Sequence, residues 1–127
     1  LGRAARERPG QLRLLTRARW TGLARDGAGW RASVRANASE LVLEAPSFVI
    51  ASGGFGHDAQ ELESLLLKHR PDLEDFPTTL GPQTTGDGVK IARDLGARLV
   101  DMDRVQLHPT GFVDPARPSE HTKTLAA

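Results

Sequence analysis

A short apolar run that ends in two glycines constrains the fold of this chain more than any other feature. Residues 48–51 read Phe-Val-Ile-Ala and are followed by Ser52, Gly53 and Gly54. A continuous apolar run of this length is typical of a parallel strand covered on both faces, in an α/β fold. Small residues at the carboxyl end of such a strand let a ligand approach the backbone closely. A plain strand-to-helix turn, in which glycine only supplies a positive φ, is the alternative interpretation.

The residues before this run read as short antiparallel strands. Candidate strands cover residues 18–23, 30–35 and 40–43. The turn signal Asp-Gly-Ala-Gly at 26–29 separates the first two, and the polar break Asn-Ala-Ser at 37–39 precedes the third. The pattern therefore predicts a β-meander that leads into the parallel strand.

Two helices are expected after the glycines. Asp58 can cap the first, because Glu61 follows at capping-box spacing. Pro71 ends that helix. The second helix is expected over 88–95, with Gly96 as its left-handed stop. The apolar stripe of the first helix consists of Leu62, Leu65, Leu66 and His69.

The Thr-Gly-Asp-Gly sequence at 85–88 places a carboxylate at the start of the second helix. A Thr or Asp in this position accepts hydrogen bonds from free backbone amides, which stabilises a helix by about 1 kcal/mol. Alternatively, the exposed amides and the positive end of the helix dipole form a polar pocket for a cofactor. In that case Asp87 accepts a hydrogen bond from a substituent of the cofactor. Gly86 and Gly88 are more than a cap requires.

His108 is the sharpest candidate for a ligand-binding side chain. Val105 and Leu107 alternate with polar residues, which predicts a half-buried strand whose His108 points away from the face that buries Leu107. Pro109 restricts His108 to an extended conformation. An imidazole in this setting can donate a hydrogen bond to a carboxylate. An isolated histidine is, however, more often a surface or satisfied interior residue.

Composition excludes several classes of function. The 127 residues are one domain's worth of chain, and the net charge of +1 gives no nucleic-acid footprint. The chain has no cysteine, which excludes disulfides and thiolate metal sites, and its histidines lack metal-ligand spacing. No apolar run approaches the roughly 20 residues of a membrane-spanning helix. The compartment stays open. No role is assigned to His57, His69 or His121.

Several short motifs follow one another in the second part of the chain. They read Phe-Pro-Thr-Thr, Gln-Thr-Thr-Gly-Asp-Gly, Val-Asp-Met-Asp, Val-Gln-Leu-His-Pro-Thr-Gly-Phe and Asp-Pro, between residues 76 and 115. Their order and spacing resemble those of soluble FAD-dependent fumarate reductase flavoproteins, in the superfamily of the succinate dehydrogenase flavoprotein subunit. The resemblance covers residues 43–127. Over 12–44 it is general, and resembles the β-meander before the last strand of the FAD domain.

The resemblance implies a reaction and a set of site residues. The reaction is hydride transfer between FAD and a C4 dicarboxylate, fumarate or succinate. His108 and Thr110 match the part of the motif that binds a substrate carboxylate, and no catalytic residue is expected within the chain itself. Ser52 stands where the family has threonine and keeps the hydroxyl. The residues expected to contact FAD are Ala51, Ser52, Gly53, Gly86 and Asp87.

The resemblance also implies a domain organisation. Residues 1–71 are expected to be the last part of the first FAD-binding segment of a Rossmann-like domain. Residues 72–127 are expected to hold the FAD-contacting loop and helix and the start of the substrate or capping domain. A first residue other than Met and an end within an apolar-to-small run suggest a fragment, incomplete at both ends. We expect this chain alone neither to retain FAD tightly nor to reduce fumarate.

Other interpretations stay open at this point. Within the same superfamily they are aspartate oxidase, urocanate reductase and ketosteroid dehydrogenase. In a different class, the chain is a non-catalytic remnant or a binding module on the same scaffold. The direction of the reaction, the electron donor and the oligomeric state are not specified by these residues.

Overall fold

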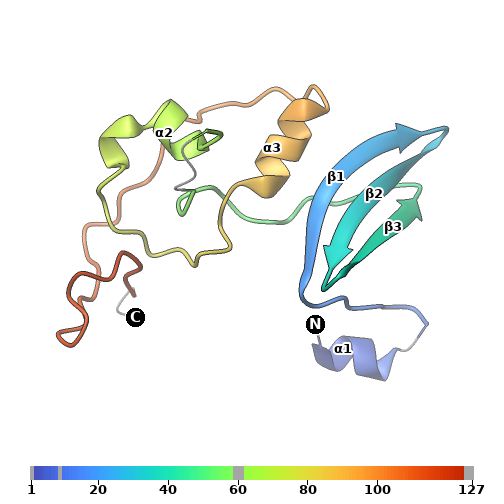
Figure 1. Ribbon diagram of the computed structural model, residues 1–127, viewed down its shortest axis with the longest axis horizontal. Coiled ribbons are helices and arrows are strands. Elements are labelled where there is room, and N and C mark those ends of the chain that lie inside the picture. Colours follow the sequence, from blue (N-terminus) through green and yellow to red (C-terminus); the bar gives the residue numbers. More distant parts are fainter. Residues whose placement is uncertain (1, 9, 59–61, 125–127) are drawn as a thin grey trace. The chain divides into compact units, whose positions relative to one another are not determined.

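The computed structural model describes residues 2–8, 10–58 and 62–124, which form two compact units (Figure 1). The first unit is Leu1–Phe48 and the second is Val49–Ala127. The unit boundary therefore falls inside the apolar run at 48–51. Each unit is described below by itself.

The first unit is built on a three-stranded antiparallel sheet in the order β1-β2-β3. The strands are β1 (Ala18–Asp26), β2 (Gly29–Ala36) and β3 (Ser39–Ala45), and the short helix α1 (Gly2–Glu7) precedes them. Two-residue loops join the strands, since Asp26 pairs with Gly29 and Ala36 pairs with Ser39. The predicted β-meander is confirmed, and each strand is longer than the sequence pattern indicated.

The sheet has one apolar and one charged face, as expected for period-two alternation. Ala32 and Val34 on β2 are buried, and Trp20 pairs across the sheet with Val34. On β2, the ring of Trp30 lies 4.6 Å from the guanidinium carbon of Arg25. The charged face carries cross-strand ion pairs that join Arg31 to Asp26 and Glu44, and Arg35 to Glu40.

The second unit consists of short elements and long connecting loops. Its helices are α2 (Leu65–His69), the 3₁₀ turn η1 (Pro71–Leu73) and α3 (Asp87–Asp94). Two isolated bridges tie its last residues back, from Thr78 to Thr122 and from Phe112 to Thr124. None of the helices in the described ranges is long and apolar enough to cross a membrane.

The parallel strand expected over residues 48–51 is not formed. No strand of the described residues pairs with this run. Val49 is 90% exposed and Ile50 is 43% exposed, so the run is not buried on two faces. A parallel strand needs a hydrogen-bonded neighbour to satisfy its backbone, and the described part of the chain supplies none. The strand prediction was therefore wrong for this structure.

The first predicted helix starts later than the capping box indicated. Ser64, rather than Asp58, caps α2, and its hydroxyl accepts a hydrogen bond from the Leu67 amide at 3.0 Å. Leu62 is 99% exposed and lies outside α2, so the apolar stripe is shorter than expected. Glu61 lies outside the described residues. The end of the helix before Pro71 is confirmed, because η1 begins there.

The second predicted helix is confirmed to within one residue at each end. Gly96 has a φ of +88° and donates its N–H to the Arg93 carbonyl, as a left-handed helix stop does. The half-buried strand expected around residues 105–108 is not formed among the described residues, and Leu107 is 51% exposed. The segment is instead a loop that lines a pocket. No strand of the described residues lies beside it to form a hydrogen-bonded pair.

Candidate functional site

The glycine segment that follows the apolar run lies alongside the first turn of α3. The Gly86 N–H donates to the Gly54 carbonyl at 3.1 Å, and the His57 N–H donates to the Thr84 carbonyl at 3.1 Å. These two bonds bring together two motifs that lie some thirty residues apart in the sequence. All the residues predicted to contact a cofactor therefore lie in two adjacent backbone segments.

Packing explains the glycines of α3. A Cβ on Gly88 would collide with the Ser52 hydroxyl and lie 2.8 Å from a methyl of Ile50. A Cβ on Gly86, whose φ is +72°, would lie 2.8 Å from side-chain atoms of both Leu65 and Phe55. Both glycines are buried and permit close contact between segments. This packing role exists whether or not a cofactor binds.

The glycine segment itself fits a ligand-binding role. Ala51, Ser52, Gly53 and Gly54 are all exposed. A Cβ added at Gly54 would meet nothing within 4 Å, so open space lies next to its backbone. Gly53 has a φ of +81°, which directs the chain past Thr84. An exposed backbone with small side chains allows the close approach that a flat cofactor ring or a ribityl chain requires.

At the start of α3, the Thr85 hydroxyl donates a hydrogen bond to Oδ1 of Asp87 at 2.9 Å. The cap residue is Gly86, so no cap side chain binds the free amides of the first turn. Asp87 is half-buried at the first helical position, where the helix dipole stabilises its negative charge. The Thr85 hydroxyl thus holds the Asp87 carboxylate at the start of α3.

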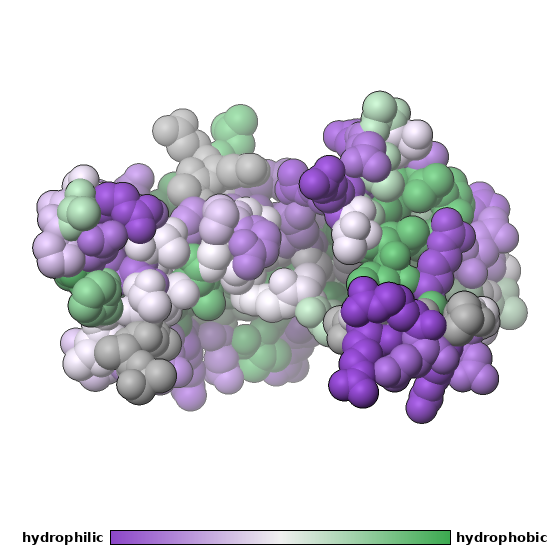
Figure 2. All heavy atoms as spheres, turned by 90° about the horizontal axis from the view of Figure 1, so that it is seen from below, coloured by the Kyte–Doolittle hydropathy of each residue, from purple (hydrophilic) through white to green (hydrophobic). Residues whose placement is uncertain are grey.

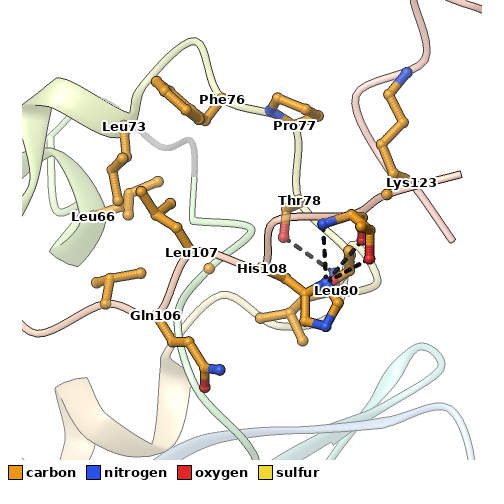
Figure 3. Close-up of a pocket in the computed structure, with 15 residues that line it drawn as sticks. Leu66, Leu73, Phe76, Pro77, Thr78, Leu80, Gln106, Leu107, His108 and Lys123 are labelled. Atoms are coloured by element: carbon orange, nitrogen blue, oxygen red, sulfur yellow. Dashed lines mark hydrogen bonds between the residues drawn. The ribbon is translucent and has the colours of Figure 1, made fainter. Parts of the chain in front are cut away.

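His108 is exposed, and its ring is oriented by Thr110. Its Nδ1 lies 2.8 Å from the Thr110 carbonyl oxygen and 3.3 Å from both the Thr110 amide nitrogen and hydroxyl. The shortest contact is the one in which Nδ1–H donates to the carbonyl. With Nδ1 engaged, Nε2 is the ring atom left for a ligand (Figure 3).

Two adjacent pockets meet at His108. The larger has a volume of about 490 Å³ and connects Gly54 and Phe55 of the glycine segment with His108. The smaller, drawn in Figure 3, has a volume of about 240 Å³ and includes Thr110 and apolar side chains such as Leu73. Their shared walls are Gly56, Thr79, Leu80, Val105, Gln106 and His108. The described residues contain no cluster of side chains able to hold a metal ion.

Arg70 anchors the loop that leads to His108, a contact that the sequence pattern did not reveal. Its guanidinium donates two hydrogen bonds of 2.8 Å to the Asp72 carboxylate and one of 3.1 Å to the Asp103 carbonyl. The hydrogen bonds from Arg70 lower the pKa of Asp72, and those to Asp72 raise the pKa of Arg70. Arg70 and Asp103 are 33 residues apart, so no local signal joins them.

The fold and this site define the class as a cofactor-binding domain. An exposed glycine segment, hydrogen-bonded to a helix start and joined by a pocket to an oriented histidine, suits a ligand with both a flat ring and polar substituents. Residues 1–126 match the family model described as FAD binding domain, and the chain belongs to this family. FAD is therefore the cofactor of the family to which the chain belongs.

Fumarate reductases are among the named relatives of the chain. The chain is 45% identical over 91 residues to fumarate reductase 1 of Saccharomyces cerevisiae, which covers 72% of this chain and 18% of that protein. It is 48% identical over 79 residues to the fumarate reductase of Schizosaccharomyces pombe, covering 62% of this chain and 15% of that protein. The resemblance to fumarate reductase flavoproteins is thus confirmed, and the chain spans less than a fifth of either relative.

The fold matches a solved structure over almost the whole chain. The open conformation of a flavocytochrome c3 fumarate reductase aligns with a TM-score of 0.73 and 27% sequence identity, over 99% of this chain and 21% of that one. The chain therefore has the fold of one part of an FAD-binding domain, including a three-stranded antiparallel sheet.

Proposed function

We propose that the chain is part of an oxidoreductase that transfers a hydride between FAD and a C4 dicarboxylate, fumarate or succinate. The observation that carries this proposal is the pocket of about 490 Å³ that joins the glycine segment to His108. A cofactor on one wall and a substrate ligand on the other are what such a transfer requires. Relatives named fumarate reductase, with up to 48% identity, support the choice of substrate class.

The glycine segment and the start of α3 would hold FAD. The exposed backbone of the segment admits the cofactor, and the Asp87 carboxylate, held by Thr85, accepts a hydrogen bond from a hydroxyl or ring N–H. Bound FAD supplies the hydride chemistry, while the protein orients the reactants. The residues assigned to this role are Ala51, Ser52, Gly53, Gly86 and Asp87.

His108 and Thr110 would bind a substrate carboxylate. The Thr110 carbonyl accepts the Nδ1–H of His108, so Nε2 donates to a carboxylate when the ring carries both protons. A charge-assisted hydrogen bond of this kind is stronger than a neutral one. The Thr110 carbonyl thus fixes the orientation of the ring, with Nε2 as the nitrogen left for the substrate.

The domain assignment follows from the same proposal. Residues 1–71 belong to a Rossmann-like FAD-binding domain, and residues 72–127 lead from the FAD-contacting loop into a substrate or capping region. The boundary between the two compact units lies between residues 48 and 49 and differs from this functional boundary. The compact units are defined by packing, whereas the assignment above is defined by function. The electron donor is left unassigned.

Two substitutions separate the proposed roles in the FAD-loaded, full-length protein of which this chain is proposed to be a part. His108→Ala should weaken dicarboxylate binding by roughly tenfold or more, with FAD content unchanged, because a hydrogen bond to a charged group is lost. Asp87→Ala should instead lower FAD retention. Titration with fumarate or succinate, followed through the flavin absorbance, measures the first effect, and the protein-bound flavin ratio measures the second.

His69→Ala is the matched control, because His69 lies on α2 and lines neither pocket. Wild-type dicarboxylate affinity in His108→Ala would show that the substrate assignment is wrong.

A further inference from the structure

Asp58 and Lys90 form a buried ion pair beside the candidate site. The Lys90 Nζ lies 2.9 Å from Asp58 Oδ2. The Asp58 side chain is completely buried, and the Lys90 side chain is 13% exposed. The other ion pairs found among the described residues have at least one partner more than a third exposed. The Asp58–Lys90 pair is therefore different in kind from the surface pairs.

The same carboxylate joins the pair to α2. Asp58 Oδ2 accepts the Leu65 N–H at 2.8 Å, and the Asp58 carbonyl accepts the Ser64 hydroxyl at 2.7 Å. Leu65 is buried and its side chain lies against Gly86, the cap residue of α3. Asp58 thus fixes α2 directly, and α2 in turn packs on the start of α3.

The pair spans the two segments assigned to FAD. Asp58 follows Gly54 by four residues, and Lys90 follows Asp87 by three, one turn further along α3. A bond between Asp58 and Lys90 therefore closes a second link between the glycine segment and α3, beyond the hydrogen bond from Gly86 to Gly54. Rotation or sliding of α3 relative to the glycine segment would break it.

Stability alone does not explain such a pair. Taking two charges out of water costs several kcal/mol per ion, and apolar replacements of similar volume are often neutral or stabilising. Asp58 Oδ1 also has no hydrogen-bond partner among the described residues, so these residues compensate the carboxylate only in part. A hydrogen-bonded ion pair does, however, fix the orientation of α3 relative to the segment that carries Asp58, whereas an apolar contact does not fix an orientation.

We propose that Asp58 and Lys90 are positioning residues that hold the first turn of α3 in register with the glycine segment for FAD binding. The inference rests on the proposed FAD contacts of Gly86 and Asp87. Neither residue of the pair touches the cofactor in this proposal. They act through the placement of Asp87 relative to Ser52 and Gly53.

The test compares single and paired substitutions in the FAD-loaded, full-length protein of which this chain is proposed to be a part. Asp58→Asn and Lys90→Met each leave one partner without its counterpart, so each should lower the melting temperature and weaken FAD binding. The double variant Asp58→Asn/Lys90→Met leaves no unpaired buried charge, so its melting temperature should return towards that of the wild type. Its FAD dissociation constant should stay raised by roughly tenfold, within the range of couplings between neighbouring sites.

Three measurements distinguish positioning from plain stabilisation. These are the FAD dissociation constant, the visible circular dichroism of the bound flavin and the melting temperature. The double variant should keep an altered flavin dichroism although its stability has recovered. Lys90→Arg keeps the charge and should keep both flavin signals. The matched control Lys68→Met removes an exposed lysine of α2 and should change none of the three measurements.

Each outcome has a defined meaning. If FAD affinity and dichroism recover together with the melting temperature in the double variant, the pair is structural only and the inference is overturned. If the wild type binds FAD and no variant changes its affinity, the inference falls while the proposed function stands. If the whole protein of which this chain is proposed to be a part does not bind FAD at all, the proposed function itself fails, and the inference fails with it.

Discussion

Gly88 is the residue at which α3 and the glycine segment approach each other most closely. A Cβ there would meet the Ser52 hydroxyl, which could rotate away. It would also lie 2.8 Å from the Cγ2 methyl of Ile50, which is attached next to the backbone and cannot swing aside. The contact is therefore relieved only by moving α3 or the backbone beside it. This makes Gly88 a test of how closely the two segments must pack.

Gly88→Ala should destabilise the protein by about 1 kcal/mol and weaken FAD binding. Overpacking costs about 1–3 kcal/mol, and the better helix propensity of alanine returns up to about 1 kcal/mol. Urea denaturation measures the first effect and FAD titration the second. Gly54→Ala is the control for stability, because its Cβ would enter open space. Equal stability of the two variants would contradict the packing argument.

The sequence predicted His108 as the ligand-binding residue but not how its ring is held. Pro109 restricts the backbone of the preceding residue, which is local information. The bond from Nδ1 to the Thr110 carbonyl depends on a loop geometry that the expected strand would not have produced. A period-two pattern identifies a strand only where a neighbouring strand exists to pair with it, and here none of the described residues provides one.

At the scale of the elements, the pair Arg70–Asp72 ties η1 to the loop that reaches His108. Arg70 also donates a hydrogen bond to the carbonyl of Asp103, whose neighbours Met102 and Arg104 line the larger pocket. The pKa of the Asp72 carboxyl is lowered below its ordinary value of 3.8, mainly by its hydrogen bonds with Arg70. A carboxyl with a lowered pKa contributes stability above the ordinary value, and this contribution is lost as the pH falls through the folded-state value.

Asp72→Asn should therefore flatten the acid dependence of stability. The unfolded state binds the proton first as the pH falls, so the wild type loses stability in acid through this group and the variant does not. Urea denaturation midpoints measured from neutral pH down to below the ordinary aspartate pKa test this. Asp75→Asn removes a nearby exposed carboxylate and is the control. Parallel acid profiles for the wild type and Asp72→Asn would contradict the argument.

Among the elements, those with local signals were predicted and those with distant partners were not. The meander follows from two turn signals, and α3 follows from Gly96 and its apolar spacing. The start of α2 depends on Asp58 accepting the Leu65 N–H from seven residues away, a bond that no short capping pattern contains. The strand prediction over 48–51 was wrong because an apolar composition shows only that a segment is able to form a strand. Whether it pairs depends on other segments of the chain.

At the scale of the whole molecule, each compact unit has a small core. The buried apolar side chains of the described residues are Ala32 and Val34 in the first unit and Leu65 and Leu73 in the second. Large apolar side chains such as Val49, Leu62 and Val100 are more than half exposed. Green apolar atoms are accordingly visible among hydrophilic ones on the face shown in Figure 2.

The 127-residue chain should therefore unfold without a single cooperative transition. Two units with separate small cores melt separately, so the calorimetric enthalpy should exceed the van't Hoff enthalpy. Differential scanning calorimetry measures both. A single sharp transition with equal enthalpies, together with dispersed methyl resonances, would show that the two units fold as one body.

The placement of the tryptophans decides what optical experiments on this protein can see. Trp20 and Trp30 are the only tryptophans, both lie in the sheet of the first unit, and the chain has no tyrosine. Tryptophan emission therefore reports on the sheet of the first unit, and the unit that carries Asp87 and His108 contains no tryptophan. An emission-based unfolding curve would describe one half of the molecule, and a tryptophan introduced into the second unit would be needed to watch the half that is proposed to meet the flavin.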